Sequence, residues 1–260
     1  NDCPIMKRLV IKLGTGVLST PAGKSLDSSQ FTRISAEIAA LQTAGYSCIL
    51  VSSAAIAAGV RIMHLKQRPT DLPGKQACAA AGQPELMRLY ATSFRKHNLS
   101  VAQLLLTHGD IDSLMHRENA RNTLDRLLEH GVIPIINEND SVAVEELRFG
   151  DNDRLSAEVA VLAQADHLII LTSVDGLQDE DGNRVKKVQD IAKAFRLVRS
   201  DKGEESVGGM KTKLEAVRKA SSAGITAHIL DGRKAGQIEA ALKGKDVGTM
   251  FPIRHNSIRS

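Results

Sequence analysis

A stretch near the middle of the chain gathers acids and amides. Residues 136–153, INENDSVAVEELRFGDND, hold three Asp, three Glu and three Asn in 18 positions, whereas the whole chain has a formal net charge of +4. A solvated surface loop would account for such a cluster without any function. The other unusual residues of the chain favour a functional loop instead.

Lys12 is a charged residue inside an apolar run, residues 8–13 (RLVIKL). Continuous apolar runs of this kind are typical of strands buried on both faces of a parallel sheet. A buried Lys is costly unless an acid pairs with it or a ligand faces it. Lys12 is therefore a candidate functional residue, and the alternative is a Lys on an edge strand exposed to solvent.

Two glycine pairs could bring backbone amides close to phosphates. Gly14-Thr15-Gly16 follows the run that holds Lys12, and Gly208-Gly209 precedes the helical pattern that holds Lys213. Such pairs fit a phosphate at a helix start or in a nest of amides, although most glycine pairs are simply turns. The chain has no GxxxxGK[ST] and no GxGxxG, so neither motif is a P-loop or a dinucleotide fingerprint.

The elements that must position these residues alternate along the chain. Runs rich in Val and Ile predict strands at 8–13, 48–52, 101–106, 132–136, 167–171 and 227–230. Helical periodicity lies at 30–43, 84–97, 118–129 and 212–223, with Ser28 as the first N-cap and Gly45 as the stop. Residues 178–184 predict a hairpin turn on Asp181-Gly182. This alternation predicts an α/β fold with a mostly parallel sheet, at whose carboxyl edge ligands bind.

Composition excludes several classes of protein. The 260 residues fit one large domain or two small ones, and 42% of them are hydrophobic. Aromatic residues make up 3%, and the basic residues are scattered, which argues against a nucleic-acid-binding protein. Cys3, Cys48 and Cys78 form no CxxC and predict reduced thiols of a cytoplasmic protein. No run reaches about 18 apolar residues, so we expect no membrane span, and we expect no signal peptide.

Five segments, in this order, resemble the glutamate 5-kinases of the amino acid kinase superfamily: VIKLGTGVL, VSSAAIAAG, AAAGQPELM, INENDSVAVEELRFGDNDRLSA and VGGMKTKLEA. The resemblance covers residues 7–251, and INEND followed by FGDND is specific to this family. It implies a three-layer αβα sandwich, the amino acid kinase fold. It also implies phosphoryl transfer from ATP to the γ-carboxylate of L-glutamate, the first step of proline biosynthesis. One kinase domain is expected at 7–253, with 7–160 binding glutamate and 161–253 binding ATP, before a flexible tail at 254–260.

The implied chemistry is charge cancellation. The attacking carboxylate is already ionised at pH 7, so no general base is needed and no His receives a role. By the resemblance, Lys12 and Lys213 neutralise the transferring phosphoryl group, and Asp153 holds both lysines. Mg²⁺ is carried mainly by the nucleotide phosphates, and its protein ligands are not assigned. The implied nucleotide contacts are Lys12, Gly14, Thr15, Thr172, Ser173, Val207, Gly208, Gly209, Met210, Lys211, Thr212 and Lys213.

The acidic stretch then becomes the glutamate site. Glutamate carries an ammonium group and two carboxylates, so its site needs acceptors for the first and neutral donors for the others. The resemblance assigns glutamate contacts to Ser53, Asp140 and Asn152, with Asn137 and Asn139 supporting the loop. Glu145 and Glu146 are expected on its solvated outer limb. Proline is expected to compete at this loop as feedback inhibitor, and the chain is expected to be a dimer or tetramer.

The chain departs from the family pattern at four places. Ser173 stands where Asp is usual, Val207 where Thr is usual, Ala54 where Gly is usual, and Gly16 where Ser is common. Three of these changes lie on the nucleotide side, so they leave ATP affinity and base preference open.

Three other assignments remain open. The chain could be another amino acid kinase, such as an acetylglutamate kinase, an aspartokinase or a UMP kinase, although the FGDND loop argues against these. It could also be a non-catalytic glutamate or proline sensor, which Ser173 and Val207 favour and the three charged catalytic residues oppose. Many bacterial members continue into a PUA domain. The chain could therefore be a short member, one domain of a longer protein, or part of a bifunctional enzyme.

Overall fold

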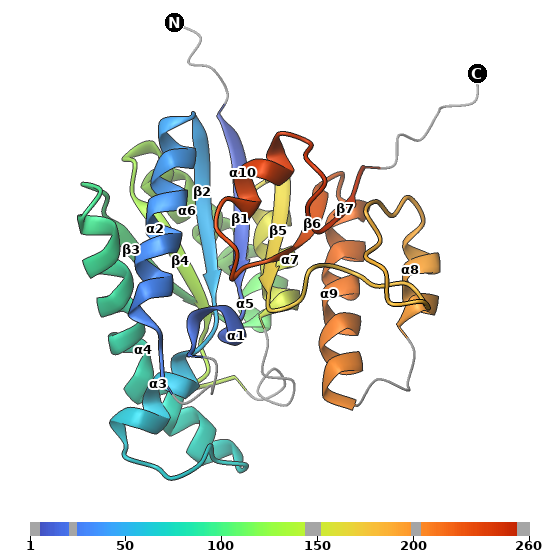
Figure 1. The fold of residues 1–260 in the computed structure, drawn as a ribbon. Helices are drawn as coiled ribbons and strands as arrows, with labels where there is room; N and C mark the ends of the chain where they lie inside the picture. The colour runs from blue at the N-terminus through green and yellow to red at the C-terminus, as the bar shows by residue number, and fades with distance from the viewer. Residues whose placement is uncertain (1–5, 21–24, 144–151, 199–203, 254–260) are drawn as a thin grey trace, which may run out of the picture.

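The computed structural model describes residues 6–20, 25–143, 152–198 and 204–253, and only the backbone of 204–208. In this part of the chain, seven strands form one sheet in the order β3-β4-β2-β1-β5-β6-β7 (Figure 1). They are β1 (Lys7–Leu13), β2 (Tyr46–Ser52), β3 (Val101–Leu106), β4 (Ile133–Glu138), β5 (His167–Thr172), β6 (Thr226–Asp231) and β7 (Thr249–Phe251). All neighbours pair in parallel except β6 and β7, which are antiparallel. The mostly parallel sheet is as predicted.

Helices cover both faces of the sheet. Val10 and Ile11 are neighbours on β1 and face opposite layers, because side chains alternate along a strand. One layer contains α5 (His108–Asp112), α6 (Leu114–Glu129), α7 (Asp153–Leu162), α8 (Ile191–Leu197) and α9 (Glu204–Ser222). The other contains α1 (Thr15–Leu18), α2 (Ser28–Thr43), α4 (Leu72–Arg95) and α10 (Gln237–Leu242). The predicted three-layer αβα sandwich is confirmed.

A helical hairpin extends beyond the sheet on the side where the parallel strands end. It consists of α3 (Ala55–Ile62) and the first half of α4 (Figure 1). The two helices cross backbone to backbone, since a Cβ on Gly82 would lie 1.9 Å from the Ala55 carbonyl oxygen. Pro84 lies inside α4, so the helix predicted to begin there is the second half of a longer one.

Two other helix starts differ from prediction. Asp27, rather than Ser28, caps α2, because its side chain accepts a hydrogen bond from the Ser29 amide at 3.0 Å. Helix α9 begins at Glu204, before the glycine pair that was expected to open it. The stop of α2 is confirmed, since Gly45 has φ +89°. The predicted turn at 178–184 is also present, closed by a bridge between Gln178 and Arg184.

Cysteine and membrane predictions can be compared with the described residues. Cys48 and Cys78 are buried free thiols, as expected, and Cys3 lies outside the described residues. No helix in the described ranges is long and apolar enough to cross a membrane. The predicted flexible tail at 254–260 also lies outside those ranges.

Candidate active site

Asp153 brings the two predicted catalytic lysines together. Lys12 Nζ lies 2.8 Å from Asp153 Oδ1, and Lys213 Nζ lies 3.1 Å from Asp153 Oδ2. The Lys213 contact is a hydrogen bond, whereas the Lys12 contact is an ion pair without hydrogen-bond geometry. Lys12 and Asp153 are both 0% exposed, and Lys213 is 7% exposed. Two buried ammonium groups therefore share one carboxylate.

Three elements far apart in the sequence produce this cluster. Lys12 lies on β1, which pairs with β2 on one side and β5 on the other, so it is not an edge-strand residue. Asp153 is the first residue of α7, where a helix dipole favours a carboxylate. Lys213 projects from α9, and its neighbour Thr212 donates a second hydrogen bond to Asp153 Oδ2 at 2.9 Å. The charges are fixed by helix and strand packing rather than by a loop.

The turn after β1 lies directly beside Lys12. Gly14 donates to the Leu171 carbonyl oxygen at 3.3 Å, and a Cβ on Gly14 would lie 3.4 Å from Lys12 Nζ. A Cβ on Gly16 would lie 3.6 Å from Ser173 Oγ, at the end of β5. Of the predicted nucleotide residues, Gly14 therefore lies beside the Lys12 ammonium group, and Ser173 lies beside Gly16.

The predicted nucleotide residues on α9 are arranged differently from expectation. Gly209 lies inside the helix and not in a nest at its start, and its carbonyl accepts from Thr212 Oγ1 and Lys213 Nζ. Met210 packs against the hydrophobic core, and Lys211 is exposed. Thr212 contacts Asp153, so it supports the catalytic cluster. Gly208 also lies within the helix backbone, and the side chain of Val207 lies outside the described atoms.

Ser53 and Asn152 lie at the end of β2. Ser53 Oγ is buried and has no hydrogen-bond partner among the described residues. Asn152 Nδ2 donates to the Ser52 carbonyl oxygen at 2.5 Å and to Asn137 Oδ1 at 2.7 Å. Asn152 therefore differs from its predicted role as a donor to glutamate, because both of its amide hydrogens are already used. Its Oδ1 is the atom left for a ligand.

A chain of hydrogen-bonded amide side chains joins Asn152 to a cavity that Asp140 lines. Asn137 Nδ2 donates to Gln83 Oε1 at 2.8 Å, and Gln83 Nε2 donates to Gln103 Oε1 at 2.9 Å. Asp140 lines the same cavity of about 440 Å³ as these two glutamines. Asn137 Oδ1 accepts from the Glu138 backbone amide at 2.9 Å, and the Asn139 backbone amide donates to the Leu106 carbonyl oxygen at 2.9 Å. Their support of the loop stays a prediction. Glu145, Glu146 and residues 149–151 lie outside the described residues.

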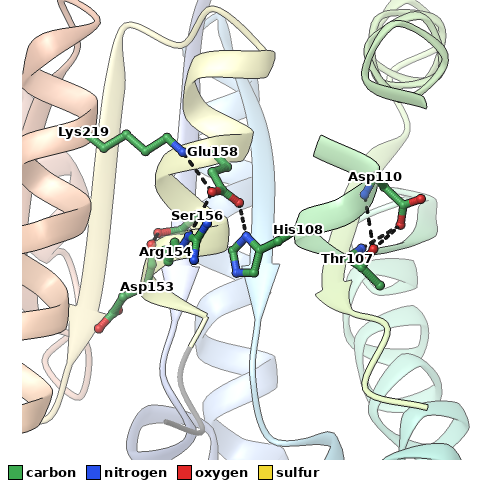
Figure 2. A network of polar contacts seen from close by, with 8 residues as sticks. All are labelled: Thr107, His108, Asp110, Asp153, Arg154, Ser156, Glu158 and Lys219. Atoms are coloured by element: carbon green, nitrogen blue, oxygen red, sulfur yellow. Dashed lines mark hydrogen bonds and ion pairs between the residues drawn. The ribbon is translucent and has the colours of Figure 1, made fainter. Parts of the chain in front are cut away.

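Glu158, on α7, is the centre of a second buried ionic cluster (Figure 2). Nothing in the sequence indicated this cluster. Its side chain is 2% exposed and contacts His108 Nδ1 at 2.5 Å, Lys219 Nζ at 2.8 Å and Arg154 Nε at 3.1 Å. Burial raises the pKa of Glu158, but the hydrogen bonds from His108 and Lys219 outweigh it and lower the pKa to about 2. Because Lys219 is on α9, Glu158 joins the two helices that also carry Asp153 and Lys213.

The described residues contain no group of three or more His, Cys, Asp or Glu side chains that could hold a metal ion. A Mg²⁺ ion that arrives with nucleotide phosphates is compatible with this arrangement, since such an ion keeps most of its ligands as phosphate oxygens and water. The lysine pair is compatible with a polyphosphate, because two ammonium groups converge on one carboxylate and ammonium groups pair with phosphate oxygens.

Comparison with known proteins gives one consistent result. The amino acid kinase family matches residues 7–231. The glutamate 5-kinase of Thermus thermophilus is 46% identical over 253 residues, covering 95% of this chain and 68% of the relative. That of Geobacter metallireducens is 44% identical, covering 96% and 69%. The chain thus spans roughly two thirds of the length of these relatives.

Solved structures of lower identity share the fold. N-acetylglutamate synthase from Neisseria gonorrhoeae matches with a TM-score of 0.69 at 16% identity, covering 95% of this chain and 60% of that one. UMP kinase from Bacillus anthracis matches with a TM-score of 0.63 at 18% identity, covering 95% and 96%. The family match and the sequence identities show that the chain belongs to the amino acid kinase family and, within it, to the glutamate 5-kinases.

Proposed function

We propose that this protein transfers the γ-phosphoryl group of ATP to the γ-carboxylate of L-glutamate, forming L-glutamyl 5-phosphate and ADP. The observation that carries the proposal is Asp153, whose two buried carboxylate oxygens each hold a lysine ammonium group. A sensor that only binds glutamate has no use for two buried cations at this position. A phosphotransferase needs them, because two anions must meet.

Lys12 and Lys213 cancel charge on the phosphoryl group as it moves. A glutamate carboxylate oxygen forms the new bond to the γ-phosphorus while the bond from that phosphorus to the bridging oxygen breaks, leaving ADP. No proton has to be removed from the nucleophile, because a carboxylate is ionised at neutral pH. Mg²⁺, when bound with the nucleotide, would neutralise phosphate oxygens. Asp153 keeps both ammonium groups in place between turnovers, so little reorganisation is needed.

Glutamate is assigned to the cavity and strand ends on the side of β2 and β4. Asp140 would pair with the ammonium group, and Ser53 Oγ, buried and without a partner among the described residues, would donate to a carboxylate. Asn152 would accept from the ammonium group through Oδ1, since its Nδ2 serves Ser52 and Asn137. Donors without charge are suited to this task, because they bind a carboxylate without neutralising the lysines.

The nucleotide is assigned to the side of β1 and β5. Gly14 and Thr15 would contact phosphate oxygens next to Lys12, and Thr172 and Ser173 would line the nucleotide at the end of β5. The N-terminal part of the domain, residues 7–160, then binds glutamate, and residues 161–253 complete the ATP site. Proline competition at the Asp140 loop, a homo-oligomeric assembly and a cytoplasmic location remain predictions from the family resemblance.

The test is ATP-dependent formation of glutamyl hydroxamate. Acyl phosphates react with hydroxylamine, so a kinase incubated with glutamate, MgATP and hydroxylamine should accumulate the hydroxamate and ADP in equal amounts. Aspartate, N-acetylglutamate and UMP in place of glutamate should give much less product. ADP without hydroxamate would instead support another acceptor. No ADP at all, while glutamate still binds, would support the non-catalytic sensor.

A further inference from the structure

Arg233 contacts the turn that follows β1. It lies in the loop between β6 and α10 and donates from Nε and Nη2 to the Gly16 carbonyl oxygen, at 3.2 and 3.1 Å. The residues it joins are 217 positions apart in the sequence. Gly16 is the last glycine of Gly14-Thr15-Gly16, so Arg233 fixes the backbone of the turn that lies against Lys12.

This turn runs into α1 and has backbone bonds of its own, such as that from the Val17 amide to the Gly14 carbonyl oxygen at 3.0 Å, and Arg233 adds a constraint from a distant part of the chain. Two of its three residues are glycines, which lose more backbone freedom on ordering than other residues do. A turn that is already held when the nucleotide arrives loses less entropy on binding, which raises affinity. Because a Cβ on Gly16 would lie 3.6 Å from Ser173 Oγ, a shift of Gly16 would also change its distance from Ser173, which follows β5.

The loop that carries Arg233 is itself fixed from two sides. The Gly232 amide donates to the Thr172 carbonyl oxygen at 2.8 Å, and a Cβ on Gly232 would lie 2.8 Å from Leu171 Cβ. Arg33, on α2, donates to the carbonyl oxygen of Gly232 and also to that of Lys234, at 3.4 Å. The loop therefore presents Arg233 from a backbone with little freedom to move.

We propose that Arg233 is a positioning residue for the nucleotide phosphates, acting through the Gly16 carbonyl, and that Arg33 supports it by fixing the loop. The proposal rests on the proposed function, because it assumes that Gly14-Thr15-Gly16 faces ATP. Neither arginine is needed for the chemical step. Their loss should change nucleotide affinity while the lysines and Asp153 still act normally.

The expected effect of Arg233→Gln is a rise in the ATP KM of about three- to tenfold, with kcat and the glutamate KM within about twofold of wild type. The lower end of this range is expected because Arg233 is exposed, and a charged contact in solvent contributes little. The upper end corresponds to the loss of one charge-assisted hydrogen bond. Arg233→Lys keeps the charge and one donor, so it should give an intermediate ATP KM. Calorimetric titration with MgATP should show the same order in Kd.

Arg8 provides a matched control. It also donates from a guanidinium group to a backbone carbonyl, that of Ala163 at 2.9 Å, and pairs with Asp125 at 2.7 Å. It lies at the opposite, amino-terminal edge of the sheet. Arg8→Gln should lower the thermal midpoint without changing the ATP KM. In the double variant Arg33→Gln with Arg233→Gln, the effects on the ATP KM should be less than multiplicative, because both act through one contact.

Three results would overturn the proposal: an ATP KM and MgATP Kd in Arg233→Gln equal to those of wild type, an equal rise in Arg8→Gln, or multiplicative effects in the double variant. If wild type makes no hydroxamate, the proposed function fails, and the MgATP titrations alone then decide the role of Arg233. If Arg233→Gln does not fold, Arg233→Lys is compared with wild type in the same assays.

Discussion

At the scale of single residues, Asp153 divides its two oxygens between two lysines. Lys12 approaches one oxygen from the centre of the sheet, and Lys213 approaches the other from α9. Removing either lysine leaves the other with the whole carboxylate, so the remaining ammonium group would be drawn away from a bound phosphate. Both lysines should therefore be needed together.

The first prediction follows from this geometry. Lys12→Ala and Lys213→Ala should each lower kcat by roughly a hundredfold or more, with a smaller change in the glutamate KM, as expected for a transition-state contact. The double variant should be little worse than either single variant. Lys243→Ala, at an exposed position on the C-terminal side of α10, serves as the control and should resemble wild type. A single variant with near-normal kcat would show that its lysine is not part of the reaction.

The second prediction concerns the choice of acceptor. Asp140→Ala should raise the glutamate KM strongly while MgATP still binds with wild-type affinity, because the ammonium group loses its counter-charge. The glutamate KM of Asp140→Asn should be closer to that of Asp140→Ala than to that of wild type, since the contact depends on the negative charge. Proline inhibition, measured as a shift of the glutamate saturation curve, should weaken in the same variants. Proline bound together with glutamate would contradict a shared site.

The meeting of Lys12, Asp153 and Lys213, the residues proposed for catalysis, could be predicted from the sequence, but the contacts around them could not. Lys12 is unusual in an apolar strand, and FGDND marks Asp153, so local sequence identifies both. His108, Glu158 and Lys219 are widely separated and follow no local pattern. Nothing in the sequence indicates that they meet. The structure differs from the donor role predicted for Asn152 for a similar reason, because the atoms that accept from its Nδ2 belong to Ser52 and Asn137, at the ends of other strands. A contact between Asn152 and glutamate stays a prediction.

At the scale of elements, α7 and α9 act as a pair joined at two levels. Asp153 and Lys213 form one contact, and Glu158 and Lys219 form the next. Lys213 can reach Asp153 only while the two helices keep this alignment. His108 extends the second level to α5 (Figure 2). Because α5 follows β3, the alignment also involves the strand that borders the cavity lined by Asp140.

The third prediction tests the second level. Glu158→Gln should lower the free energy of unfolding by about 1–3 kcal/mol at pH 7, the range for a lost charged hydrogen bond whose partners can return to water. Because the folded pKa of Glu158 is about 2, below its usual value of 4.5, the contribution is present above pH 4.5 and is lost as pH falls toward 2. The gap between wild type and variant in urea unfolding should therefore narrow between about pH 5 and about pH 3. Glu215→Gln, at an exposed position on α9, should show no such gap.

Element boundaries show where local signals mislead. Gly82 and Pro84 are helix-breaking residues by propensity, yet both lie inside α4. Gly82 is there because α3 crosses so closely that no side chain would fit. Likewise, Gly208-Gly209 suggested a helix start, but both glycines lie inside α9, which begins at Glu204. Strand β7 was not predicted, since three residues carry too little pattern.

At the scale of the whole molecule, one sheet holds both halves of the site. Strand β1 lies at its centre, with the β2 and β4 ends on the proposed glutamate side and the β5 and β6 ends on the nucleotide side. Strand positions and the parallel arrangement could be read from the Val- and Ile-rich runs. The strand order could not, because it depends on pairings between distant segments. The contacts of the site therefore depend on a correctly formed sheet.

The fourth prediction concerns the pH dependence of the sheet. His167 on β5 and His228 on β6 lie with ring centroids 5.6 Å apart, and His167 Nδ1 and His228 Nε2 are buried without partners among the described residues. Burial, and then the neighbouring His167, lower the pKa of His228 from 6.5 to about 4. Burial also lowers the pKa of His167, against the nearby Asp166 carboxylate. The folded sheet therefore prefers both rings neutral.

As pH falls below 6.5, the unfolded chain binds a proton at His228 that the folded chain does not bind, so stability decreases until pH reaches about 4. The loss should be about 3 kcal/mol for His228, at about 1.4 kcal/mol for each tenfold difference in proton affinity. Urea unfolding of wild type and His228→Gln at about pH 7 and about pH 4.5 would measure it, and the variant should lose less stability between these values. Exposed His130 provides a control, since His130→Gln should follow wild type. The pH range over which His228 affects stability lies above the range over which Glu158 does. If wild type loses stability only below pH 4.5, the acid sensitivity arises from the α7–α9 contact of Glu158 and not from the histidines of the sheet.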